Sequence, residues 1–141
     1  KGNWTDNEIT DLVRLTAAST AVLYHGRVLS GVSRFEYFSG TALSPNLRTA
    51  KAAIVHGGVG STYMALSLGV PMLMAPQHAN HYLLAERLEK LGVAIPLQDA
   101  LAKKPTEMTD LLQTLRMNCA RFIGDPRRGA TRSAELIINL A

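Results

Sequence analysis

The chain has 141 residues and a formal net charge of +4, with 15 Lys and Arg against 11 Asp and Glu. This length accommodates one domain, and 47% hydrophobic residues suffice for its core, whereas no apolar run approaches the roughly 20 residues of a membrane helix. The basic residues stand in short runs without interleaved aromatic residues, which argues against binding of nucleic acid and makes ordinary solvated surface the simplest explanation of the charge.

The first predicted element is a helix near the amino terminus, where Thr5 and Glu8 have the spacing of a capping box. Its apolar face consists of Ile9, Leu12 and Val13. Five short apolar segments then alternate with helical ones, which is typical of parallel strands joined by crossover helices. These predicted strands are residues 21–24, 35–38, 52–55, 70–75 and 93–97. The sequence therefore predicts an α/β domain with a Rossmann-like parallel sheet flanked by helices.

The helices that follow are predicted from spacing and from their end signals. A helix over residues 61–68 ends at Gly69, and a second helix takes Asn80 as its N-cap and ends at Gly92. Residues 97–105 are predicted to form a surface loop. The final third is predicted to be helical, with two apolar stripes: Met108, Leu111, Leu112, Leu115, Cys119 and Phe122, and later Ala130, Ala134, Ile137 and Ile138.

A glycine-rich turn joins the strand at residues 52–55 to the helix at residues 61–68. The first amides of a helix have no acceptor within the helix and lie at the positive end of its dipole, so an anion docked there is stabilised by hydrogen bonds and charge. No Gly-Lys-Ser/Thr follows, which excludes a P-loop, and the third glycine of a dinucleotide fingerprint is missing. Such a turn is also often only a tight connection. The candidate phosphate ligands are His56, Gly57, Gly58, Gly60, Ser61 and Thr62.

A second polar cluster follows the strand at residues 70–75 and includes His78, Asn80 and His81. The carboxyl ends of parallel strands share one edge of a sheet, so one ligand can contact this cluster and the glycine-rich turn together. His78 and His81 have a spacing that metal ligands use, but no Cys or carboxylate lies near them and the chain has no Asp-x-Asp. We therefore expect no metal site.

Three motifs together resemble the donor-binding half of GT-B glycosyltransferases, in the family with antibiotic, sterol and plant natural-product enzymes. The motifs are His-Gly-Gly-x-Gly-Ser-Thr from residue 56, Ala-Leu-x-x-Gly-Val-Pro-x-Leu-x-x-Pro from residue 65 and Ala-x-Arg-Leu-x-x-Leu-Gly from residue 85. The resemblance is close over residues 35–97. It implies that residues 1–141 are a single C-terminal, donor-binding domain and that an amino-terminal partner domain holds the acceptor and supplies the catalytic base.

The resemblance also implies roles for single residues. His56 would contact the diphosphate of the donor, and the glycines and hydroxyls that follow would hold its oxygens. The loop at Ser39, Gly40, Thr41 and Leu43 would lie against the nucleobase. Asn80 and His81 stand where many members have an Asp-Gln pair that binds sugar hydroxyls. An amide accepts more weakly than a carboxylate and a histidine changes role with protonation, so the identity of the sugar stays open.

The implied function is inverting, metal-independent transfer of a hexosyl group from a UDP- or dTDP-sugar to an acceptor hydroxyl, with no further cofactor. Two alternatives remain, namely half of a GT-B-like sugar-nucleotide epimerase and a non-catalytic module that binds nucleotide sugars or a partner. Acceptors in this family include lipids, and a basic chain suits an anionic membrane surface, but no further feature indicates membrane association. The lone Cys119 lies on an apolar stripe, so we expect a packing role in a reducing, cytoplasmic compartment.

Overall fold

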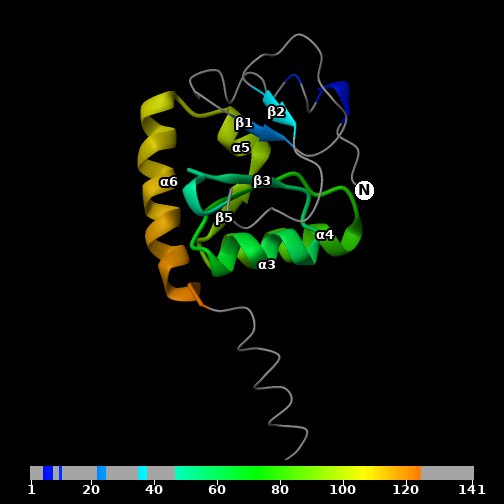
Figure 1. The fold of residues 1–141 in the computed structure, drawn as a ribbon. Coiled ribbons are helices and arrows are strands. Elements are labelled where there is room, and N and C mark those ends of the chain that lie inside the picture. The colour runs from blue at the N-terminus through cyan, green and yellow to red at the C-terminus, as the bar shows by residue number, and fades with distance from the viewer. Residues whose placement is uncertain (1–4, 8–9, 11–21, 25–34, 38–46, 125–141) are drawn as a thin grey trace, which may run out of the picture.

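The computed structural model of the chain describes residues 5–7, 10, 22–24, 35–37 and 47–124, which are the coloured parts of Figure 1. Three groups of predictions lie outside these residues: the apolar face of the first helix, the nucleobase loop at residues 39–43 and the last helix after residue 124. Within the described part of the chain, no helix is both long and apolar enough to cross a bilayer.

All five predicted strands are present, and the last three are shorter than predicted. Strands β1 (Val22–Tyr24) and β2 (Phe35–Tyr37) pair in parallel. Strands β3 (Ala53–Val55), β4 (Met72–Met74) and β5 (Ala94–Pro96) form a second parallel sheet in the order β3-β4-β5. The predicted α/β architecture with parallel strands is thus confirmed, and in the described residues the strands are divided between two sheets.

After β3 the described residues form the helices α3 (Val59–Ser67), α4 (Ala79–Lys90), α5 (Leu97–Leu101) and α6 (Pro105–Cys119), and the 3-10 turn η1 (Ala120–Phe122) follows. In Figure 1, α3 and α4 lie on one side of the three-stranded sheet, α5 lies on the other side and α6 runs along its flank. The chain therefore covers both faces of this sheet, as a parallel sheet requires.

The core is divided by the three-stranded sheet. Because successive side chains of a strand point to opposite faces, Met72 and Met74 pack with the helices α3 and α4, whereas Leu73 packs on the other face with Leu97 and Ala100. Cys119 is fully buried in the first cluster, which confirms its predicted place on an apolar stripe.

Two local predictions were wrong. Asn80 is not the N-cap of α4, because the helix begins earlier and the carbonyl of His78 accepts the amides of His81 (2.9 Å) and Tyr82 (3.1 Å). The segment at residues 97–105 is not simply a loop, because Leu97 and Ala100, three residues apart, are buried on one face of α5.

Helix α6 is attached to the segments that enter the strands. The guanidinium of Arg116 donates to the carbonyls of Ala50 (2.5 Å) and Lys51 (3.2 Å), just before β3. The side-chain amide of Asn118 donates to the carbonyl of Gly92 (2.9 Å), just before β5. These contacts hold the amino ends of the outer strands and so position the sheet whose opposite edge carries the candidate site.

Candidate functional site

The glycine-rich turn leaves the carboxyl end of β3 and enters α3. His56 is half-buried at the strand end, and the buried Gly57 has a φ of +100°, a conformation that L-residues with a side chain rarely adopt. Gly58 is the N-cap of α3, which begins two residues before the predicted start. The turn thus reverses the chain within three residues and directs the start of α3 toward the edge of the sheet.

Three amides at the start of α3 are available to a ligand. The first helical hydrogen bond runs from the amide of Thr62 to the carbonyl of Gly58 (3.1 Å). The preceding amides, those of Val59, Gly60 and Ser61, have no acceptor among the described residues. Val59 and Gly60 are exposed, and a Cβ at Gly60 would meet nothing within 4 Å among the described residues. Val59 was not among the predicted ligands, because only the observed helix start brings its amide into this group.

The two hydroxyls that were predicted as diphosphate ligands differ in their surroundings. The Ser61 hydroxyl is part-buried and donates to the carbonyl of Gly58 (3.0 Å). The Thr62 side chain is 1% exposed, and its Oγ1 has no hydrogen-bond partner among the described residues. The predicted role of Thr62 in diphosphate binding therefore stays a prediction, and a hydroxyl in this position is accessible to a ligand only if the turn moves.

The second polar cluster lies at the start of α4. His78 is the N-cap and is exposed, Asn80 is exposed in the first turn, and His81 is half-buried. The rings of His78 and His81 are tilted by 47°, with centroids 5.0 Å apart. The Nδ1 atom of His81 is buried and has no hydrogen-bond partner among the described residues. This nitrogen therefore keeps its capacity to donate to or accept from a bound group.

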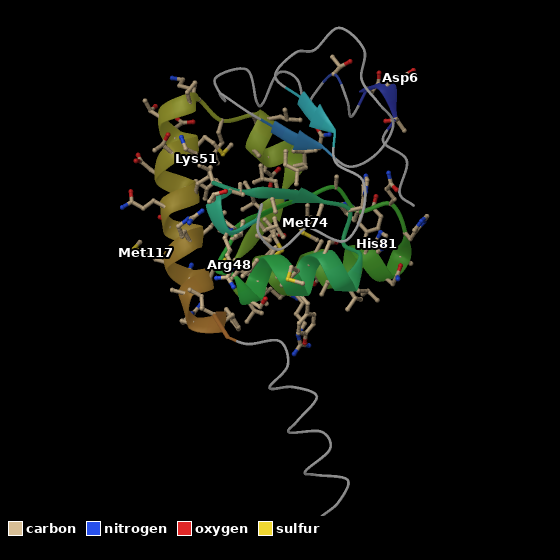
Figure 2. The ribbon with its side chains drawn as sticks, viewed as in Figure 1. Asp6, Arg48, Lys51, Met74, His81 and Met117 are labelled. Carbon is tan, nitrogen blue, oxygen red and sulfur yellow. The ribbon has the colours of Figure 1, made fainter. Side chains whose placement is uncertain are left out.

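Gly57 and His81 bring the two predicted clusters into direct contact. A Cβ built on Gly57 would lie 3.0 Å from the Cβ of His81 and 3.2 Å from its Cα. The parallel register explains the contact, because it pairs Val55 with Met74 and so places the turn after β3 beside the segment after β4. Figure 2 shows His81 on the side of the molecule opposite α6. A single ligand at this edge can thus reach both clusters.

The electrostatics of this edge favour an anion. Neither α3 nor α4 has an acidic residue in its first turn, so no carboxylate of either first turn offsets the positive end of its helix dipole. Among the described residues, no three His, Cys, Asp or Glu side chains gather into a metal-binding group. The four residues predicted to lie against a nucleobase, Ser39, Gly40, Thr41 and Leu43, are outside the described residues.

Comparison with known proteins identifies the family. Residues 39–137 match the family of the erythromycin biosynthesis protein CIII-like C-terminal domain. The chain belongs to this family. The match covers the glycine-rich turn, the start of α4 and the helix α6, so every described part of the candidate site lies within the EryCIII-like domain.

Relatives of this EryCIII-like domain are named as glycosyltransferases. The chain is 39% identical over 87 residues to the L-demethylnoviosyl transferase of Streptomyces niveus, which covers 61% of the chain and 21% of that protein. It is 37% identical over 101 residues to the O-mycaminosyltylonolide 6-deoxyallosyltransferase of Streptomyces fradiae, which covers 64% of the chain and 23% of that protein. The chain thus spans about a fifth of the length of these relatives.

The fold of the EryCIII-like domain recurs in a solved glycosyltransferase. The spinosyn forosaminyltransferase SpnP superposes with a TM-score of 0.73 at 18% identity, over 98% of this chain and 41% of SpnP. The family match, the relatives and the shared fold confirm the resemblance read from the three motifs, namely that of a C-terminal domain of a GT-B glycosyltransferase.

Proposed function

We propose that this chain is the donor-binding domain of a glycosyltransferase that moves a hexosyl group from a nucleoside diphosphate sugar to an acceptor hydroxyl. The observation that carries the proposal is the contact of Gly57, in the turn that leads into α3, with His81 at the start of α4, next to three α3 amides that have no acceptor among the described residues. The first suits a diphosphate and the second presents an amide and an imidazole to a neighbouring sugar. The names of the relatives support the same reaction class.

The diphosphate is held by His56 and by the amides of Val59, Gly60 and Ser61, with Gly57 and Gly58 shaping the turn. During transfer the bond between the sugar carbon and the diphosphate oxygen breaks, and negative charge grows on the departing diphosphate. Amides and a helix dipole that already face this charge stabilise it without reorganising. In this proposal they take the place that a divalent metal has in other glycosyltransferases.

The acceptor hydroxyl attacks the sugar carbon from the face opposite the diphosphate, so the configuration inverts. Its oxygen forms the new bond, and its proton passes to a base in the amino-terminal part of the enzyme. Asn80 and His81 hold the sugar hydroxyls, and residues 39–43 hold the base of a UDP or dTDP donor. No group of this chain then takes part in proton transfer, and its contribution is to bind and orient the donor.

Calorimetric titration of the chain with UDP, dTDP and GDP tests the proposal. We expect saturable binding of one nucleotide, unchanged by EDTA. His56→Ala is expected to weaken it about tenfold or more, because a hydrogen bond to a charged group contributes about 1.5–3 kcal/mol. The melting temperature of both proteins is measured as a control, so that lost binding is not confused with unfolding. No binding by the folded wild-type chain contradicts the proposal.

The division of roles between the two halves predicts that this chain alone binds nucleotide and transfers no sugar. A full-length enzyme that contains it is expected to release nucleotide diphosphate from donor and acceptor together. Product analysis of that enzyme separates transfer from epimerisation of the donor. Measurable transfer by the 141-residue chain contradicts the assignment of the base to the amino-terminal half.

A further inference from the structure

Gly57 has tighter surroundings than the other two glycines of the turn. A Cβ on Gly57 would lie 3.0 Å from the Cβ, 3.2 Å from the Cα and 3.3 Å from the carbonyl oxygen of His81. At Gly58 the nearest atom would be the Ser61 hydroxyl at 3.6 Å, and at Gly60 nothing lies within 4 Å. Two of the three atoms that face Gly57 belong to the backbone and cannot rotate away. A side chain at Gly57 therefore requires the turn and α4 to move apart.

Backbone hydrogen bonds connect His81 to the rest of the first turn of α4. The amides of His81 and Tyr82 both donate to the carbonyl of His78, at 2.9 and 3.1 Å, which ties the backbone of this turn together. Asn80 lies between His78 and His81 in the chain, so a displacement of His81 is expected to displace Asn80 as well. The contact at Gly57 thus sets the place of both predicted sugar-binding residues relative to the phosphate-binding turn.

We propose that Gly57 is a positioning residue that fixes the distance between the diphosphate-binding amides of α3 and the sugar-binding residues Asn80 and His81. This inference rests on the proposed function of the site. Gly57 acts through His81, whose buried Nδ1 lacks a partner among the described residues and would receive one from the sugar. Substitution of Gly57 changes the fit of a sugar that is attached to the diphosphate, whereas a free nucleotide diphosphate uses only one side of the contact.

The experiment compares Gly57→Ala with Gly69→Ala in the full-length protein. Gly69 lies just beyond the opposite end of α3, has a φ of +71°, and a Cβ there would meet only the flexible end of Ile123, which is 62% exposed. Both substitutions strain a left-handed backbone position, but only the Cβ added at Gly57 would meet α4. Gly69→Ala therefore controls for the loss of stability that such strain causes.

The measured quantity is the ratio of two dissociation constants, that of the nucleotide sugar and that of the free nucleotide. The probes are UDP-glucose with UDP and dTDP-glucose with dTDP. For Gly57→Ala we expect this ratio to rise about 3- to 10-fold, which corresponds to one or two lost hydrogen bonds to the sugar. For Gly69→Ala we expect an unchanged ratio and a lower melting temperature.

An unchanged ratio in Gly57→Ala, whether both ligands bind as before or are weakened equally, would overturn the positioning role and leave the proposed donor site standing. Failure of the wild-type protein to bind any of the four probes would overturn the proposed function and this inference with it. The two failures are thus distinguishable in the same set of titrations.

Discussion

Replacement of Thr62 by valine tests how α3 packs on the sheet. Thr62 is 1% exposed, and its hydroxyl has no partner among the described residues, although it lies in the segment predicted to bind a diphosphate. Valine has nearly the same shape and replaces the hydroxyl by a methyl group. Because a buried hydroxyl without a partner is costly, we expect Thr62→Val to stabilise the domain.

The size of the effect follows from the burial. A buried polar group without a hydrogen bond costs about 1–3 kcal/mol, and local relaxation recovers part of this, so we expect a gain of about 1 kcal/mol. For a domain of this length the melting temperature would rise by about 4 °C. Ser61→Ala provides the contrast, because the Ser61 hydroxyl donates to the carbonyl of Gly58 and its loss should cost about 0.5 kcal/mol.

Urea unfolding of the wild type and both variants measures these changes, with an unchanged m-value as the check that the variants unfold in the same way. A loss of stability in Thr62→Val as large as that in Ser61→Ala would refute the reasoning, because it would mean that the Thr62 hydroxyl is hydrogen-bonded in solution. Nucleotide titration of Thr62→Val then tests the sequence-based role separately. Weaker binding by a stably folded variant would show that the hydroxyl reaches the diphosphate.

Three further predictions concern α6. Burial raises the pKa of the Cys119 thiol from 9.0 to about 11, against the opposing charge of Arg116. The folded protein therefore keeps this proton to a higher pH than the unfolded chain does, so the thiol's contribution to the free energy of unfolding is complete below pH 9 and is lost between pH 9 and 11. In urea unfolding at several pH values, the free energy of unfolding of Cys119→Ala should fall less steeply over this range than that of the wild type. Leu115→Ala, at a side chain 4% exposed, should cost about 2–4 kcal/mol in urea unfolding, whereas Met117→Ala, at one 63% exposed, should cost less than about 0.5 kcal/mol. Arg116→Met keeps the aliphatic stem but loses the hydrogen bonds to the two carbonyls before β3, so we expect the free energy of unfolding in urea to fall by about 1 kcal/mol. An unchanged free energy of unfolding would mean that solvent replaces both bonds.

The parts of the fold that were predicted correctly rest on signals that are local in the sequence. Apolar segments of strand length, helical spacing and the terminal glycines Gly69 and Gly92 fixed the order of strands and helices. The five-residue helix α5 was missed because it is shorter than two turns, too short for apolar residues to recur over a second turn. The N-cap of α4 was misplaced because His78 caps through its backbone carbonyl, whereas the prediction looked for a capping side chain at Asn80.

The sequence predicted that both polar clusters of the candidate site lie at one edge of the sheet, but it did not predict the contact between Gly57 and His81 that joins them. Parallel pairing of β3 and β4 follows from the sequence and places both clusters at the same edge. The approach of Gly57 to His81, 24 residues later in the chain, depends on the path of both turns in space. Likewise, the residue type of Thr62 indicated a ligand, but its position on the inner face of α3 is decided by the true start of that helix.

The separation of the two ends of the sheet explains how one small domain can be stably packed and still present polar groups to a ligand. Contacts of α6 hold the amino ends of the outer strands, whereas His56, Gly57 and His81 lie at the carboxyl ends. Figure 2 shows the two ends directly, with Lys51 beside α6, His81 on the far side and the buried Met74 between them. The Nδ1 atom of His81 can stay without a hydrogen-bond partner among the described residues, ready for a ligand, because the packing that stabilises the sheet is made elsewhere. Substitutions near α6 should therefore change the free energy of unfolding and leave nucleotide binding by the folded protein unchanged.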